Sequence, residues 1–394
     1  MFRLYLVGML GQWSSMNMQI VARSLLVYRI SGSGTILGLT SLANAIPTIV
    51  ISLMGGALAD RLQKKNILVF CQTVSMLTSL AVALALTFGY LGEAREGSWW
   101  ILVVTAAIQG ATMGLLMPAR QAIVPEIVAH DQVMNAISLN MMGMNAFRML
   151  APAVTGFIID AWDFNVIYYV STAMYGLAAF CMLLLPKTKA ILSHGQSALL
   201  DIVDGVRYIR REKTILLVLV ATLFTMVCGL PFAQLLPMIT EDILDVGASG
   251  MGILLTVSGA GAIAGSLVLA SLPNRKRGII MLVSGILMGV SLVVFSFSRM
   301  WVLSLVLVIF IGLGQTGNRT AGNALAQNYT DPEYRGRVMS FMMMGLGFSS
   351  LGTFFAGVVA EAVGIEWAMS GLAVLLIIVS LMLLGMTARV RRME

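Results

Sequence analysis

Three arginines lie inside long apolar runs of the sequence: Arg23, Arg148 and Arg319. A charged side chain at the centre of a bilayer costs roughly 2.5–3.5 kcal/mol on insertion scales, so it normally faces a watery cavity or a partner. Arginine binds carboxylate and phosphate groups through forked hydrogen bonds. These residues therefore indicate recognition of an anionic group. Arg23 and Arg319 lie close enough to the ends of their runs to snorkel to the interface, which leaves a structural role open for both.

Polar residues accompany these arginines at helical spacing. Gln12, Gln19 and Arg23 fall on one stripe, and Gln315 precedes Arg319 by about one turn. Polar stripes on apolar helices mark a cavity wall. We predict a positive substrate cavity, suited to an anionic or zwitterionic amphiphile, that is lined by Gln12, Gln19, Arg23, Gln109, Asn145, Arg148, Gln234, Gln315 and Arg319.

The elements that must position these residues are membrane helices. The chain of 394 residues is 58% hydrophobic and only 11% charged, whereas soluble domains carry roughly 25% charged residues. Lipid leaves no backbone group unpaired, so each long apolar run is read as a helix. The sequence predicts an all-α polytopic membrane protein with twelve spans near 4–28, 35–58, 67–91, 99–118, 134–159, 165–185, 214–240, 250–272, 279–298, 300–325, 338–360 and 367–388.

The basic residues predict how these spans are oriented. With the N-terminus in the cytoplasm, nineteen of the 25 Lys and Arg residues fall in cytoplasmic segments and three in external loops. This bias follows the positive-inside rule and places both termini in the cytoplasm, in a plasma (inner) membrane. The net charge of +7 is thereby explained without nucleic acid.

The chain divides into two halves of six helices. We predict an N-terminal bundle over 1–186, a cytoplasmic linker over 187–213 and a C-terminal bundle over 214–394. Apolar residues at helical spacing in the linker, opposite charged ones, predict an amphipathic helix on the membrane surface.

The halves also read as parallel repeats, which is one transporter architecture. A shift of 214 residues maps Gly38 onto Gly252, Asp60 onto Asn274 and Arg61 onto Arg275. A shift of 201 residues maps Met141 and Met142 onto Met342 and Met343, Gly156 onto Gly357, and Asp160 onto Glu361.

The loop after the second span, Gly55-Gly56-Ala57-Leu58-Ala59-Asp60-Arg61-Leu62-Gln63-Lys64-Lys65, resembles the signature loop of the major facilitator superfamily, G-x-L-A-D-R-x-G-R-K. The segments Arg120 to Pro125 and Asp331 to Ser340 are similar to loops of its drug- and siderophore-exporter-like branch. This resemblance implies two six-helix bundles that rock to give alternating access, usually for export. It also implies a conformational latch formed by Gly55, Asp60, Arg61, Lys64, Lys65, Arg120, Arg335 and Arg337.

The segment Ala151 to Gly156 resembles a weakened form of the antiporter motif of helix five, G-P-x-x-G-G, with Pro152 and Gly156 retained. No carboxylate stands well inside a span, since Asp160 and Glu361 lie near external ends. Intramembrane carboxylates normally carry transported protons. The lack of such a carboxylate argues against proton coupling, so protons are only one candidate coupling ion, and the direction of transport stays open.

Other classes fit the sequence less well. His130 and His194 are scattered in loops, so we expect no metal, no cofactor and no enzyme activity, and no G-x-x-x-x-G-K-[ST] phosphate loop is present. We expect a monomer in the lipid bilayer that carries a small-molecule substrate. A broad-specificity multidrug efflux pump is the alternative, as is an importer or lipid flippase on the same fold.

Overall fold

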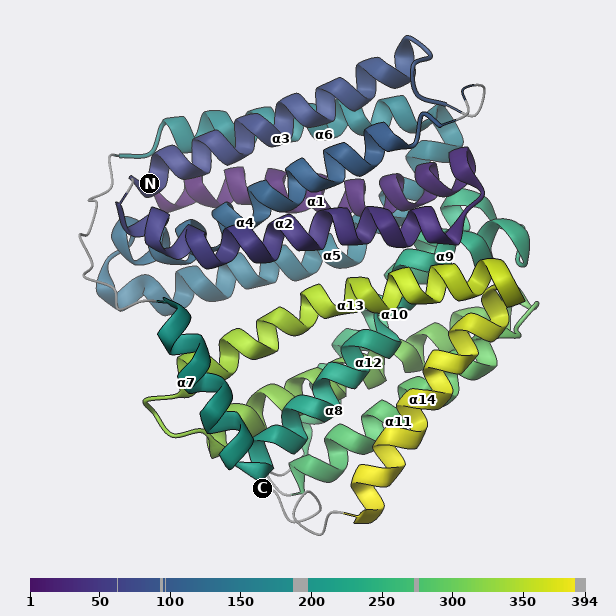
Figure 1. The fold of residues 1–394 in the computed structure, drawn as a ribbon. Helices are drawn as coiled ribbons and strands as arrows, with labels where there is room; N and C mark the ends of the chain where they lie inside the picture. The colour runs from purple at the N-terminus through teal and green to yellow at the C-terminus, as the bar shows by residue number, and fades with distance from the viewer. Residues whose placement is uncertain (62, 93–94, 96, 187–197, 273–275, 387–394) are drawn as a thin grey trace. The chain divides into compact units, whose positions relative to one another are not determined.

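A computed structural model describes the whole chain except residues 62, 93–94, 96, 187–197, 273–275 and 387–394, and the side chains of 53–61, 130, 198–203, 346 and 386 are also left undescribed. The described helices, shown in Figure 1, are α1 (Phe2–Ser31), α2 (Gly34–Arg61), α3 (Lys64–Thr87), α4 (Trp100–Ile127), η1 (His130–Gln132), α5 (Val133–Trp162), α6 (Phe164–Leu183), α7 (Ala198–Arg211), α8 (Lys213–Gly229), α9 (Pro231–Asp242), α10 (Gly247–Ser271), α11 (Arg277–Ser296), α12 (Trp301–Tyr329), α13 (Arg335–Val363) and α14 (Ile365–Met386).

The nearly all-helical architecture confirms the predicted fold class. Within the described part of the chain, 11 helical stretches are long and apolar enough to cross a membrane. Helix α1 is not among them, although it is 30 residues long, because its polar stripe lowers its mean hydropathy. The predicted seventh span is split into α8 and α9 at Leu230, directly before Pro231. Proline cannot donate a backbone hydrogen bond, which explains the break.

The chain forms two compact units. Each unit consists mainly of one half of the sequence together with a short segment from the other half. Unit 1 comprises Met1–Gly32, Leu39–Gly195 and Val246–Thr256. Unit 2 comprises Ser33–Gly38, Gln196–Asp245 and Val257–Glu394. Helix α2 therefore begins in unit 2 and continues in unit 1, whereas α10 begins in unit 1 and continues in unit 2.

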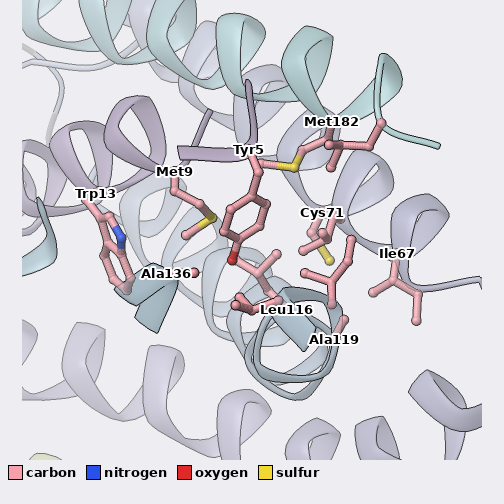
Figure 2. Close-up of a cluster of buried hydrophobic side chains, with 13 residues drawn as sticks. Tyr5, Met9, Trp13, Ile67, Cys71, Leu116, Ala119, Ala136 and Met182 are labelled. Carbon is pink, nitrogen blue, oxygen red and sulfur yellow. The ribbon is translucent and has the colours of Figure 1, made fainter. Parts of the chain in front are cut away.

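In unit 1, α6 packs against both α1 and α3, α3 packs against α4, and α1 packs against α5. Figure 2 shows Tyr5, Met9 and Trp13 of α1 directed into one buried cluster with Cys71 of α3 and Leu116 of α4. The spacing of four residues keeps the three α1 side chains on one helix face. This cluster fixes α1 against the C-terminal half of α4, where Arg120 lies.

In unit 2, α11 packs against α12 and α14, and α8 packs against α13. Helix α7 joins the core through Ile209, which is 7% exposed and clusters with Ile215 of α8 and Val338 of α13. The other side of α7 presents exposed Arg207 and Arg211. The predicted amphipathic helix thus forms one wall of unit 2.

Candidate functional site

One polar cluster of unit 1 gathers Arg23 with side chains of two other helices. Arg23 is half-buried on α1, and its guanidinium lies within electrostatic range of the phenol groups of Tyr168 and Tyr175 on α6. The Tyr175 hydroxyl accepts a hydrogen bond of 3.0 Å from Nε2 of Gln109 on α4. The structure therefore brings together two predicted cavity residues, Arg23 and Gln109. The guanidinium of Arg23, placed beside these phenol groups, is available to bind a polar ligand.

Two further predicted cavity residues have partners on α3. Nε2 of Gln72 donates to Oε1 of Gln12 over 2.6 Å, and Nε2 of Gln19 donates to the Ser79 hydroxyl over 2.8 Å. Gln12 is 2% exposed and Gln19 is 8% exposed. Both side chains therefore join α1 to α3 inside unit 1, and their contact with a substrate stays a prediction.

The middle of α5 presents Asn145 and Arg148, which are both exposed. A charge in the middle of a span normally faces a water-filled cavity or a partner group of the protein. Neighbouring methionines of the same helix are also exposed, Met141 by 56% and Met142 by 67%. Flexible thioethers adapt to ligands of different shapes. This face of α5 therefore combines a cation with an adaptable apolar surface.

The remaining predicted cavity residues lie in unit 2 and are half-buried: Gln234 on α9, and Gln315 and Arg319 on α12. Unit 2 also holds an apolar pocket of about 240 Å³ between α7, α8 and α13. Arg210 is the one charged residue of its lining. Thr222, another lining residue, packs against Gly322, three residues along α12 from Arg319. The pocket therefore borders the turn of α12 that carries Arg319.

The first part of the predicted latch is well anchored in unit 1. Lys64, which is 4% exposed, forms an ion pair with Glu126 of α4. The Lys65 ammonium donates a hydrogen bond to the backbone carbonyl of Leu185. Both lysines thereby tie the start of α3 to neighbouring helices.

Arg120 is the third described member of the latch, and it is 8% exposed. Its guanidinium carbon lies 4.2 Å from the ring centre of Trp13, a cation–π contact. One terminal nitrogen, NH2, donates to the sulfur of Met117 over 3.0 Å, whereas NH1 has no partner among the described residues. A buried donor left unpaired costs about 1–3 kcal/mol. The site therefore suits an additional acceptor.

Three residues of the predicted latch, Gly55, Asp60 and Arg61, have side chains outside the described part of the structure. The sequence placed these residues in a loop, whereas the backbone is helical to Arg61, the last residue of α2. Their contacts with Arg120 or with the lysines remain a prediction.

The latch residues of unit 2 hold α7. Nε of Arg335 donates to the backbone carbonyl of Thr330 over 3.3 Å. Arg337 lies 4.0 Å from the Asp204 carboxylate of α7. The ring of Tyr208 stacks on Tyr334 with 4.0 Å between the ring centres. The amphipathic helix is thus joined to the segment that enters α13.

The helix-five motif lies where α5 meets the beginning of α10, inside unit 1. A Cβ atom at Gly156 would lie 2.2 Å from the carbonyl oxygen of Ala248, and one at Gly252 would lie 2.3 Å from the carbonyl oxygen of Pro152. No side chain fits between these backbones. Pro152 and Gly156 therefore act here as a helix-crossing surface.

Sequence reasoning did not single out Tyr168, Tyr175 or Tyr208. Tyr168 and Tyr175 are two helical turns apart, with Ser171 on the same face. This polar stripe in an apolar run is the signal that could have found them. Tyr208 lies on the amphipathic helix, and no local sequence pattern indicates which distant residue it contacts.

Tyr208, on the amphipathic helix outside the predicted spans, is a titratable group whose surroundings shift its pKa. Burial is the main cause that raises its pKa above the ordinary value, and the charges of Asp331 and Glu212 raise it further. Its hydroxyl donates to Oδ2 of Asp331 over 3.0 Å and accepts from the Asp331 amide over 3.1 Å. The phenol therefore stays neutral at physiological pH.

Among the described residues, no group of three or more His, Cys, Asp or Glu side chains could hold a metal ion. Cys71, Cys181 and Cys228 are buried and unpaired with one another. The groups gathered around Arg23 offer hydrogen bonds and charge to a ligand.

Comparison with known proteins agrees with this chemistry. Residues 2–394 match a major facilitator family described as "transmembrane secretion effector". The staphyloferrin A transporter of Staphylococcus aureus is 24% identical over 84% of this chain and 82% of its own length. Macrolide efflux protein A of Streptococcus pyogenes is 23% identical over 85% of this chain and 83% of its own length.

The fold is also found among solved structures. A D-xylose–proton symporter superposes with a TM-score of 0.75 at 10% identity, over 99% of this chain and 98% of that chain. An identity this low establishes the shared fold alone.

Proposed function

We propose that this chain, which belongs to the transmembrane secretion effector family of the major facilitator superfamily, exports a small anionic or zwitterionic amphiphile by alternating access. It is a multi-pass membrane transporter, as its family and its membrane-capable helices show. The plasma (inner) membrane, both termini in the cytoplasm and a monomeric state are part of the proposal. Protons are a candidate coupling ion within it.

The observation that carries the proposal is the exposed Arg148 in the middle of α5. Since lipid does not solvate a guanidinium, an exposed one at this depth indicates a water-filled surface. A cation on that surface attracts carboxylate or phosphate groups and repels cationic drugs. The apolar pocket beside Arg210 supports an amphiphile, because it offers apolar contacts next to a positive charge. Relatives named for efflux support the direction of transport.

The substrate class is tested by the thermal stability of detergent-purified protein with ligands of one alkyl chain length. An alkyl carboxylate, an alkyl glycoside and an alkylammonium salt form the panel, with staphyloferrin A and a macrolide added. A ligand at 100 times its dissociation constant stabilises the bound state by about 2.7 kcal/mol. We expect stabilisation by the carboxylate, lost in Arg148→Ala and retained in part in Arg148→Lys.

Arg299→Ala is the matched control, because Arg299 is an exposed arginine outside the described helices. It should leave the stabilisation unchanged. Equal stabilisation of wild type and Arg148→Ala would give the arginine a structural role. Stabilisation by the alkylammonium salt would favour a broad-specificity multidrug efflux pump. Accumulation of the ligand inside vesicles that keep the cellular orientation of the membrane would instead favour an importer or flippase.

We also propose that Asp60 is the acceptor for Arg120 in the cytoplasmic latch. The support is the family motif around Asp60 and the unpaired NH1 atom of buried Arg120. Asp60→Asn should insert normally and slow transport, because it weakens a charge-assisted hydrogen bond that one access state needs. Transport of the stabilising ligand into vesicles measures the effect. An unchanged rate in Asp60→Asn would contradict this role.

A further inference from the structure

The apolar pocket between α7, α8 and α13 lies wholly within unit 2, and its volume is about 240 Å³. Among its lining residues, Thr222 carries the only hydroxyl. This hydroxyl already donates to the backbone carbonyl of Val218 over 2.9 Å, so it is not offered to a ligand. Apart from the charge of Arg210, the lining therefore provides apolar contacts.

The pocket is elongated along α8. Its lining on this helix runs from Leu216 to Met226, which spans about 15 Å at the rise of an α-helix. This length is half of the roughly 30 Å hydrocarbon core of a bilayer, so it matches one leaflet. One end is closed where α13 meets α8, since a Cβ atom at Gly345 would lie 2.7 Å from the Met226 sulfur. Leu216, Leu223 and Phe348 are exposed, so a chain can enter from one side.

Arg210 lies at the opposite end of the pocket, in the last turn of α7 and shortly before α8 begins. It is exposed, and within the described part of the chain no hydrogen bond or ion pair engages its guanidinium. Asp204, an acidic residue of the same helix, lies 4.0 Å from Arg337 instead. Glu212 is exposed nearby, and Arg211 balances its charge. The guanidinium of Arg210 is therefore available to an anionic group.

A positive charge at one end of an apolar groove of this length suits an anionic phospholipid. With α7 in the cytoplasm, as the basic residues predict, Arg210 lies at the depth of the headgroups and the lining runs alongside the acyl chains. Basic pockets between membrane helices on this side bind anionic headgroups. An exported amphiphile shares this chemistry, but the pocket is smaller than the roughly 300–1,000 Å³ of sites that bury a drug-sized ligand. A phospholipid places only one chain there, because its other chain stays in the bilayer.

We propose that this pocket binds an anionic phospholipid of the cytoplasmic leaflet, with one acyl chain between α8 and α13 and the phosphate at Arg210. The bound lipid joins α7 to these two helices and so stabilises unit 2. The site depends neither on which substrate is carried nor on the direction of transport.

The full chain, purified in detergent and freed of lipid, tests the site by its thermal stability as lipid is added to the micelles. Dioleoyl-phosphatidylglycerol and dioleoyl-phosphatidylcholine are compared, because they have the same chains and differ in net charge. Wild type should bind the phosphatidylglycerol about fivefold more tightly, as expected for one basic residue beside an anionic headgroup. Arg210→Ala should remove this preference, and Arg210→Lys should retain part of it.

Arg207→Ala is the matched control for charge, because Arg207 is an exposed arginine of the same helix that does not line the pocket. It should leave the preference unchanged. Val220→Trp tests the acyl chain, because Val220 is a half-buried lining residue and the larger ring would fill the pocket. It should weaken the binding of both lipids about tenfold through lost apolar burial. Leu223→Phe replaces it if that variant does not fold, and Val290→Trp, on the exposed surface of α11, should have no effect.

The proposal is overturned if Arg210→Ala keeps the preference, if Arg207→Ala removes it as well, or if filling the pocket leaves lipid binding unchanged. It is also overturned if the alkyl carboxylate used to test the substrate class displaces the phosphatidylglycerol, because the pocket would then belong to the substrate site. Arg148→Ala should leave phosphatidylglycerol binding unchanged. A failure of the lipid site and a failure of the proposed function therefore give different results.

Discussion

At the scale of single residues, two buried basic side chains are each stabilised by one close partner, an aromatic ring or a carboxylate. Arg120 lies on the face of Trp13, and Lys64 is buried against Glu126. Such contacts allow a cation to remain at a membrane helix end without full hydration. Removing one partner therefore leaves a buried charge without that compensation.

Glu126→Gln should therefore lower the free energy of unfolding by about 3 kcal/mol, because Lys64 would remain buried without its counter-charge. The thermal unfolding midpoint in detergent measures the loss. The double variant Glu126→Gln, Lys64→Met removes both charges and should recover most of the stability. A double variant as unstable as the single one would show that the ion pair is not the source.

The residue scale also shows what the sequence could indicate. It singled out Arg23 and Gln109 separately, and the structure gathers them around Tyr175. The sequence analysis also assigned Gln12 and Gln19 to the substrate cavity, although in the structure each side chain forms a hydrogen bond with α3. Periodicity places a residue on a helix face but does not say which neighbouring helix covers that face.

At the scale of elements, α7 is a docked helix rather than a loose connection. Tyr208 joins it to unit 2 by a ring stack and by two hydrogen bonds with Asp331. Arg337 adds an exposed charge contact with Asp204. Because the segment around Asp331 leads into α13, a movement of α13 reaches α7 directly.

Tyr208→Phe should loosen α7 while it retains the ring stack. Loss of hydrogen bonds worth about 1 kcal/mol should raise amide exchange in residues 198–211 roughly fivefold. Tyr208→Ala, which also removes the stack with Tyr334, should raise it further. Identical exchange in wild type and Tyr208→Phe would show that Asp331 does not hold the helix.

The pH dependence of this docking follows from the raised pKa of Tyr208. A raised pKa means that folding favours the neutral phenol. The contribution to stability is therefore fully present below the ordinary tyrosine pKa of about 10 and is lost as the pH rises through the folded value. The protection of the α7 amides, measured as their exchange rate relative to the intrinsic base-catalysed rate at each pH, should therefore stay constant from pH 6 to pH 9.

At the scale of the whole molecule, the predicted repeats correspond to equivalent contacts. Equivalent residues of the two repeats make equivalent contacts at Asp160 and Glu361. Each pair lies within one compact unit, yet each involves a helix that is shared by both units.

The orientation of the molecule is predicted by its basic residues. A reporter that is active only in the cytoplasm should be active when fused after residue 394 or at residue 212, and inactive when inserted at residue 299. The positive-inside rule is the physical reason. The reverse pattern of activity would contradict the proposed topology and would place the predicted latch on the external side of the membrane.

The sequence by itself determined the all-helical fold class, the approximate places of the membrane-capable helices, the amphipathic helix and the repeat. These depend on local quantities, since the bilayer thickness sets the length of an apolar run and helical period sets its faces. Even the break before Pro231 is local, because proline lacks the backbone donor.

Only the tertiary structure decided which distant groups meet. Asp160 and Ser249 are 89 residues apart, and Thr35 and Glu361 are 326 residues apart. Nothing in a local pattern says that an acid near the end of one helix will bond the first turn of another. That pairing depends on backbone crossings so close that only glycine fits, and such crossings exist only once the helices are packed.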